Sequence, residues 1–242
     1  MRARGQASIE WLALVLLVAL ALGAAAAVVH PARALRAALL HDPPDPLAAA
    51  YGTEVAGLVR RHAPNLVYER GRHEVPVDPR ACRVRLCATA GATLFTHVVR
   101  SGATLYVQYW EYFPDSVWNG IAGRHVDDWE SYQVRIEPGG RVRVRASAHH
   151  GYTGRRIGRD LNLNQIDPRL VGVGAWTTPT GWLRIARGSH AGYVARGPLG
   201  RRTTPVDQVV LVPIETARLP ASYAITPPWR KRVYADPESP AT

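Results

Sequence analysis

Beyond residue 62 the chain consists of short apolar segments separated by turn residues, and this pattern constrains its fold more than any other feature. Helical periodicity is largely absent there, and the segments recur at intervals of about ten residues. Such spacing is typical of a sandwich of short strands. The sequence therefore predicts an all-β fold, a single β-sandwich of antiparallel strands. The predicted strands lie in segments 64–69, 93–99, 104–113, 129–136, 141–148, 182–186 and 208–214.

A helix and a linker are expected before these strands. Residues 48–63, AAAYGTEVAGLVRRHA, are expected to form one helix. Pro43, Pro44 and Pro46 stop a preceding helix and stiffen the spacer that contains them. The Pro-rich segment 225–242 is expected to wrap the surface as coil. The predicted organisation is a linker over 31–50, a sandwich domain over 51–236 and a tail over 237–242.

The first thirty residues contain an uncharged apolar run over residues 11–29. A helix of that length, at about 1.5 Å per residue, is about 28 Å long and matches the hydrocarbon core of a bilayer. The sequence thus predicts one membrane-spanning helix within residues 1–30. Arg2 and Arg4 favour a cytoplasmic N-terminus and an extracytoplasmic body in the cell membrane, although Arg33 and Arg36 weaken this charge rule.

This segment differs from an ordinary secretory signal because its small and polar residues precede the apolar run. RGQASIEWLALVLLV resembles the class III signal of type IV pilins and tight-adherence pilin-like proteins. In that family a prepilin peptidase cuts after a Gly and the mature chain has a Glu at its fifth position. The resemblance implies cleavage after Gly5, with Gln6 first and Glu10 fifth, and implies the peptidase and pilin-like subunits as partners. An uncleaved signal anchor is the alternative, and it predicts the same topology.

The basic composition does not indicate a nucleic-acid partner. The formal net charge is +11, Lys231 is the only lysine, and the arginines are scattered along the chain. A nucleic-acid surface gathers its basic residues on one element with aromatic residues between them. We therefore expect no nucleic-acid binding.

The two cysteines, Cys82 and Cys87, are five residues apart. That separation does not match the two-residue gap of a metal knuckle or a redox motif. In an exported domain the expected interpretation is a small disulfide loop. The alternative is a pair of free thiols that lie close together.

Ionisable residues gather at residues 125–130, directly at the start of a predicted strand. If residues 128–136 form a strand, Asp128 and Glu130 share one face with Tyr132 and the apolar residues that follow. Burial of two carboxylates on such a face without a partner is costly. We therefore expect a cation at this edge of the sandwich.

The next segment, 141–148, has valine and alanine alternating with arginines, so its valines are expected to face the core. Pairing Ile136 with Val142 across the Pro-Gly-Gly turn then places His150 opposite Asp128. His125 approaches from the preceding loop. Two carboxylates with an imidazole suit a divalent metal, with magnesium or calcium favoured by oxygen ligands and zinc favoured by histidine. The alternative is an acidic rim paired with arginines.

The stretch YWEYFPDSVWNGIAGRHVDDWE resembles the central segment of the necrosis- and ethylene-inducing-like proteins. ASAHHGY resembles a downstream segment of that family, and IARGSHAGYV is similar to the related vacuolar-sorting-associated proteins. The resemblance implies a β-sandwich with one divalent cation, and the donor types favour magnesium or calcium, with zinc or manganese as alternatives. The implied metal ligands are Asp115, His125, Asp128 and Glu130.

The resemblance also has departures. Asp127 stands where the family signature has its second histidine, and the downstream histidine corresponds to His149 rather than to His150. His190, in RGSHAGY, is either a further site residue or a structural histidine in a tight turn. The additional site candidates are therefore Asp127, His149, His150 and His190.

Three functions fit these features. The first is a membrane-anchored, exported sandwich that binds a divalent metal and recognises a glycan or a lipid head group. The second is a minor pilin-like subunit that displays the sandwich. The third is a metal-dependent hydrolase in which His125, Asp127, His149 or His150 is the general base. No nucleophile elbow, phosphate loop or zinc-protease helix occurs in the sequence, so the enzyme interpretation has the least support.

Overall fold

The structure of the protein is a computed structural model that describes residues 44–69, 75–83, 91–117, 124–148, 151–153, 156–157, 176–198 and 201–239. Within these ranges no helix has both the length and the apolar character needed to cross a membrane. Several predictions fall outside them: the membrane helix of residues 1–30, the processing residues Gly5, Gln6 and Glu10, and the side chains of Cys87, His149 and His150.

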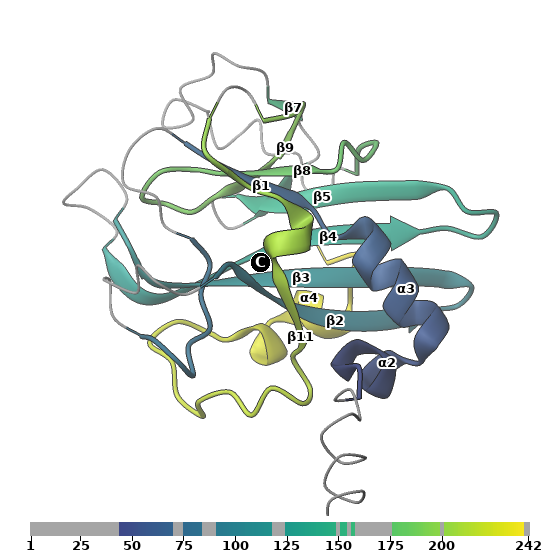
Figure 1. Cartoon of the computed structure of the whole chain (residues 1–242), viewed down its shortest axis with the longest axis horizontal. Coiled ribbons are helices and arrows are strands. Elements are labelled where there is room, and N and C mark those ends of the chain that lie inside the picture. Colours follow the sequence, from purple (N-terminus) through teal and green to yellow (C-terminus); the bar gives the residue numbers. More distant parts are fainter. Residues whose placement is uncertain are drawn as a thin grey trace, which may run out of the picture. The chain divides into compact units, whose positions relative to one another are not determined.

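Two β-sheets pack against each other around a common core (Figure 1). Every segment predicted to be a strand contains one. The six-stranded sheet has the order β11 (Val210–Pro213), β2 (Thr93–Ser101), β3 (Thr104–Ser116), β4 (His125–Ile136), β5 (Val142–Ala148) and β6 (Gly151–Thr153). The five-stranded sheet has the order β10 (Thr203–Thr204), β1 (Asn65–Tyr68), β8 (Trp182–Ile185), β9 (Gly192–Ala195) and β7 (Arg156–Ile157).

The prediction that all strands are antiparallel is wrong. Three pairs are parallel: β1 with β8, β11 with β2, and β7 with β9. Each pair joins strands far apart in the sequence, whereas the antiparallel β2, β3, β4 and β5 follow one another directly. Hydrophobic alternation does not distinguish these cases, because a half-buried strand has the same period whichever way its neighbour runs.

The predicted register between β4 and β5 is confirmed. Ile136 pairs with Val142, and the pairing continues to Tyr132 opposite Ala146. Beyond that point the C-terminal end of β5 pairs with β6. The expected position of a histidine opposite Asp128 lies outside the described residues and stays a prediction.

The inner face of the six-stranded sheet, which we define as the face toward the five-stranded sheet, forms the main core. Tyr109, Phe113 and Tyr132 on this face belong to the same buried cluster as Leu66 of β1 and Leu183 of β8. Alternation along the strands assigns these side chains to one side, as the sequence predicts. Asp128 and Glu130, which share a face with Tyr132, therefore lie on the inner face.

The outer face of the same sheet is covered by the C-terminal part of the chain. Trp110, Tyr112 and Trp129 form a second core cluster with Ile214 and Val233. The C-terminal segment does wrap the body, as expected, but it is not only coil. It contains η5 (Pro228–Arg230) and α4 (Arg232–Ala235), and another short helix, η4 (Val206–Gln208), precedes β11.

Arg145 shows how completely this outer face is enclosed. Its side chain is 0% exposed, although the alternation in β5 gives no indication that its arginine face is covered. Its Nε donates to Gln133 Oε1 at 3.0 Å and its Nη2 donates to the carbonyls of Pro237 and Ser239. Residues 237–239, predicted to begin a separate tail, are thus part of the folded body.

The predicted single helix is two helices, α2 (Pro46–Tyr51) and α3 (Thr53–His62). Gly52 separates them with a φ of 79°, a left-handed conformation that interrupts a helix and that glycine tolerates. Asp45 caps α2 through a hydrogen bond from the Leu47 amide. The compact unit starts at Asp45 rather than at residue 51, so the predicted linker ends earlier than residue 50.

Candidate functional site

Carboxylates from β3 and β4 converge on the inner face. Glu111 lies directly opposite Glu130 in the strand pairing, and Phe113 lies opposite Asp128. Because side chains two residues apart share a face, Glu111, Asp128 and Glu130 all point to the same side of the sheet. We call these three residues the acidic cluster. Asp115 follows on the same face of β3 and is 5% exposed.

Glu111 is the most deeply buried member of the acidic cluster. Its side chain is 0% exposed, and neither carboxylate oxygen has a hydrogen-bond partner among the described residues. Burial raises its pKa well above the ordinary value, and the negative charges of Glu130 and Asp128 raise it further. Sequence reasoning missed Glu111. The available signal was an acid between Tyr109 and Phe113, on the apolar face of a predicted strand.

Glu130 lies partly buried beside it. Burial raises the pKa of Glu130 to about 8, and the charge of Asp128 contributes to the increase. The Ser147 hydroxyl donates a hydrogen bond to Glu130 Oε2 and opposes that increase. Asp128 and Glu130 both lie on the inner face of β4, as the alternation predicts. Neither forms an ion pair with a guanidinium group among the described residues.

Asp128 contacts two imidazole rings. Its Oδ2 lies 2.9 Å from Nδ1 of His190, and its Oδ1 lies 3.9 Å from Nε2 of His125. His190 is 0% exposed and stacks on the Phe113 ring, with the centroids 3.9 Å apart and the planes 8° from parallel. The structure thus brings two histidines to Asp128: His125, three residues before it in the sequence, and His190, 62 residues after it.

A tight turn before β9 positions His190. The Val117 amide at the end of β3 donates to the Gly188 carbonyl at 2.7 Å. Gly188 has a φ of 76°, and a Cβ atom there would lie 2.6 Å from the Val117 carbonyl oxygen. His190 itself has a φ of 52°. The two interpretations of RGSHAGY are therefore compatible, since the histidine ends a tight turn and also contacts Asp128.

Asp127 points to the outer face and does not join the acidic cluster. It accepts hydrogen bonds from Arg83 Nη2 at 2.8 Å, from the Tyr112 hydroxyl at 2.7 Å and from the Ala224 amide at 2.8 Å. Burial tends to raise its pKa, but the Arg83 guanidinium and the other donors hold the pKa below its ordinary value. Its φ of 63° is a conformation that aspartate tolerates better than most residues.

Lys231, the only lysine, also lies on the outer face. Its Nζ donates to the Trp129 carbonyl at 3.2 Å and lies 5.6 Å from the centre of the Trp110 ring. Burial lowers its pKa, and the negative charges of Glu130 and Asp128 oppose that change. Lys231 therefore interacts with the acidic cluster through the sheet, at a distance, and forms no ion pair with it among the described residues.

The donor types suit a hard divalent cation, because carboxylate oxygens with one or two imidazoles are common ligands of such ions. The described residues, however, contain no group of three or more His, Cys, Asp or Glu side chains already arranged to hold a metal ion. Asp128 and Glu130 instead make the hydrogen bonds given above. The unpartnered Glu111 carboxylate is the feature that fits a bound cation best.

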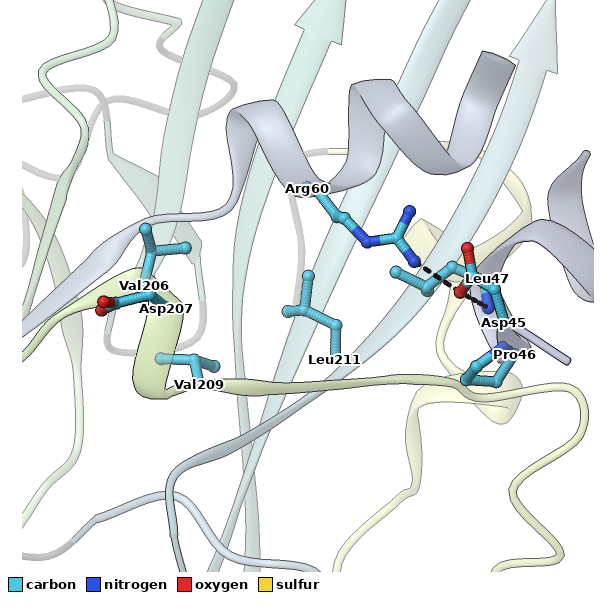
Figure 2. Close-up of a pocket in the computed structure, with 8 residues that line it drawn as sticks. All are labelled: Asp45, Pro46, Leu47, Arg60, Val206, Asp207, Val209 and Leu211. Carbon is cyan, nitrogen blue, oxygen red and sulfur yellow. Dashed lines mark hydrogen bonds and ion pairs between the residues drawn. The ribbon is translucent and has the colours of Figure 1, made fainter. Parts of the chain in front are cut away.

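A cavity of 390 Å³ lies apart from the acidic cluster. Figure 2 shows Arg60 of α3 pointing at Asp45 beside Leu47, and Arg60 and Asp45 form an ion pair. No residue predicted to form a site lines this cavity. Its lining residues are Asp45, Pro46, Leu47, Arg60, Val206, Asp207, Val209 and Leu211.

No protein-family model matches the sequence, and no curated protein does. The chain is similar to the solved structure of NLPPya in complex with mannosamine, at 17% identity over 81% of this chain and 89% of that one, with a TM-score of 0.48. The complex of NLPPya with glucosamine gives 17% identity, coverage of 81% and 90%, and a TM-score of 0.47. Necrosis and Ethylene inducing Protein 2 from the causal agent of cocoa's Witches Broom disease gives 17% identity, coverage of 64% and 72%, and a TM-score of 0.40. At these identities and TM-scores the likenesses carry no argument about function.

Proposed function

We propose that the folded body binds a divalent cation at the acidic cluster and uses it to recognise a polar surface ligand such as a glycan or a lipid head group. Asp128 and Glu130 would hold the ion, with Asp115 and His125 as further ligands. Magnesium or calcium is the expected ion because the donors are mainly carboxylate oxygens. Zinc or manganese would depend more on His125.

One observation carries this proposal: two glutamates lie directly opposite each other inside the sandwich, and the oxygens of Glu111 have no hydrogen-bond partner among the described residues. Like charges at directly opposite positions of neighbouring strands destabilise a sheet. Buried carboxylates are normally paired with a cation or fully hydrogen-bonded. A bound divalent ion would compensate this charge, and among the described residues no arginine or lysine forms an ion pair with it.

The environment of Asp128 supports the same proposal. A carboxylate that binds a metal is commonly oriented by a hydrogen bond from a second residue. His190 is in such a position, since it is fixed by the Phe113 ring on one side and by the turn at Gly188 on the other. With His190 holding one oxygen of Asp128, the second oxygen is the one that would face the ion.

The proposed location of the body is extracytoplasmic, and the apolar segment of residues 11–29 would tether it to the membrane. A peptidase would cleave the chain after Gly5. A bonded disulfide at Cys82 supports an oxidising compartment. The N-terminal sequence of the exported protein tests the processing. A chain that starts at Gln6 is expected, and one that retains Arg2 to Arg4 would contradict it.

The direct test of the cation is the metal content of the purified full chain. The wild-type chain, after gel filtration from buffer with calcium and magnesium, is expected to retain a single ion, and Asp128→Ala is expected to lose it. Asp207→Ala, which removes an exposed acid remote from the cluster, is the matched control. Equal metal content in all three chains would rule out the site. Calorimetric titration with glucosamine or mannosamine, with and without the ion, then probes the ligand.

A further inference from the structure

Glu111 is a buried acid that the four ligands implied by the sequence do not include. It is fully buried between Tyr109 and Phe113 in the middle of β3, and neither of its oxygens has a hydrogen-bond partner among the described residues. A carboxylate left in this state costs free energy, so such a group requires either a proton or a cation. Burial of one polar atom is commonly tolerated, but an acid with both oxygens unpartnered is unusual.

Among the described residues, the neighbours of Glu111 on β4 add negative charge, and no ion pair with Glu111 is formed. Glu130 is its cross-strand partner, and Asp128 lies two residues away from Glu130 on the same face of β4. From the five-stranded sheet, Tyr68 belongs to the main core, and its hydroxyl makes a hydrogen bond with Thr204. The Lys231 ammonium donates to a backbone carbonyl from the outer face.

The cross-strand geometry brings the two glutamates within reach of one ion. Directly opposite residues in an antiparallel pair have Cβ atoms about 5 Å apart, and both side chains leave the sheet on the same side. Two carboxylates starting from such positions converge on one cation without a change in the strands. A main-chain rearrangement is therefore unnecessary.

We propose that Glu111 supplies a further carboxylate to the cation site, so that the ion lies between β3 and β4 and joins Glu111 to Glu130. This inference rests on the proposed function, and it moves the ion deeper into the sandwich than Asp115 and His125 alone would place it. An added carboxylate increases the charge that the ion must balance, which favours a divalent over a monovalent cation.

Glu111→Gln tests this inference because it removes the charge and keeps the size of the side chain. In calcium titrations of the full chain, followed by the shift of the thermal unfolding midpoint and by calorimetry, the variant is expected to bind at least about tenfold more weakly than the wild type. Glu54→Gln, which removes an exposed acid in the first turn of α3, is the matched control and is expected to bind as the wild type does.

Two further variants keep the test valid if the Glu111→Gln chain does not fold. Glu111→Met places an apolar side chain of similar volume in an apolar core, and such replacements of buried charged groups are often neutral or stabilising. The double variant Glu111→Gln with Glu130→Gln measures coupling. If both carboxylates bind one ion, the two losses of affinity are not additive, because the second substitution acts on a site already impaired.

The outcomes separate this inference from the proposal on which it rests. Calcium binding in the wild type that weakens in Glu111→Gln and Glu111→Met supports both. Wild-type binding that is unchanged in both variants overturns the role of Glu111 and leaves the site at Asp128 standing. Absence of calcium, magnesium, manganese and zinc binding in the wild-type chain overturns both.

Discussion

The two faces of the β3–β4 pair bury charged side chains in opposite ways. On the outer face, Asp127 has three hydrogen-bond donors, and Arg145 has three acceptors and two aromatic rings within 4.4 Å of its guanidinium carbon. On the inner face, Glu111 has no partner among the described residues. A buried charge with several partners is held in one packing arrangement, whereas a buried carboxyl group without them costs free energy.

This comparison also separates residues that look alike in the sequence. Asp127, Asp128 and Glu130 lie within four positions, yet the alternation of the strand sends Asp127 to a structural network and the other two to the acidic cluster. Their pKa values change in opposite directions for the same reason. Donors around Asp127 outweigh its burial, while burial and like charge dominate at Glu130.

The largest expected change in the free energy of unfolding is for the substitution of Arg145. Arg145→Ala leaves the carbonyls of Pro237 and Ser239 without their donor and opens a space between two aromatic rings. We expect the free energy of unfolding, measured by urea denaturation, to fall by about 3–4 kcal/mol. Arg141→Ala removes an exposed ion pair just before β5 and is expected to change this free energy by less than about 0.5 kcal/mol. Equal losses in the two variants would contradict a sealed outer face.

A smaller loss is expected at Asp127. Asp127→Asn keeps the shape and removes the charge that Arg83 and the Ala224 amide contact, so the free energy of unfolding at pH 7 is expected to fall by about 2 kcal/mol. Asp207→Asn, at an exposed acid, is the control and is expected to cause little change.

The effect of Asp127→Asn is also expected to depend on pH. The pKa of Asp127 in the folded protein lies below its ordinary value of 3.8, so its stabilising contribution is complete above that value and is lost as the pH falls through the folded pKa. The difference between wild type and variant is therefore expected to shrink in acid. A difference that stays constant from pH 7 to the acid limit would show that the charge of Asp127 does not matter.

The smallest expected change in the free energy of unfolding is an increase, for the substitution of Glu111 on the inner face. In buffer with a chelator, Glu111→Gln is expected to raise the free energy of unfolding by about 1 kcal/mol, because burial raises the pKa of Glu111 and folding at pH 7 must therefore add a proton to it, a cost that Gln does not have. Thermal and urea unfolding with Glu54→Gln as the reference measure this. A loss of stability in Glu111→Gln would mean that the carboxyl group has a structural partner and that the two faces do not differ as described.

Local patterns predicted much of this architecture. The alternation in 129–136 and 141–148, with a Pro-Gly-Gly turn between them, was enough to predict the register of Ile136 with Val142. The same alternation placed Asp128 and Glu130 on one face. The single helix over 48–63 was wrong because Gly52, at a positive φ, interrupts it, and a lone glycine in a helical pattern does not reveal its φ.

The candidate site was predicted only in part, because its members come from strands and turns that sequence proximity does not connect. Glu111 lies in an apolar segment whose pairing partner becomes known only with the β3–β4 register. His190 reaches Asp128 from a turn 62 residues away. The same limit applies to Arg145, whose burial depends on the C-terminal segment that crosses the outer face.

The sequence by itself determined the strands, the two faces of β4 and the concentration of acids at its start, because period-two alternation and turn residues are local properties of a chain. Only the tertiary structure decided which strands run parallel, which arginines are buried and which glutamate lacks a hydrogen-bond partner among the described residues. These outcomes depend on contacts between distant segments, where the cost of burying a charge is set by the neighbours that packing brings to it.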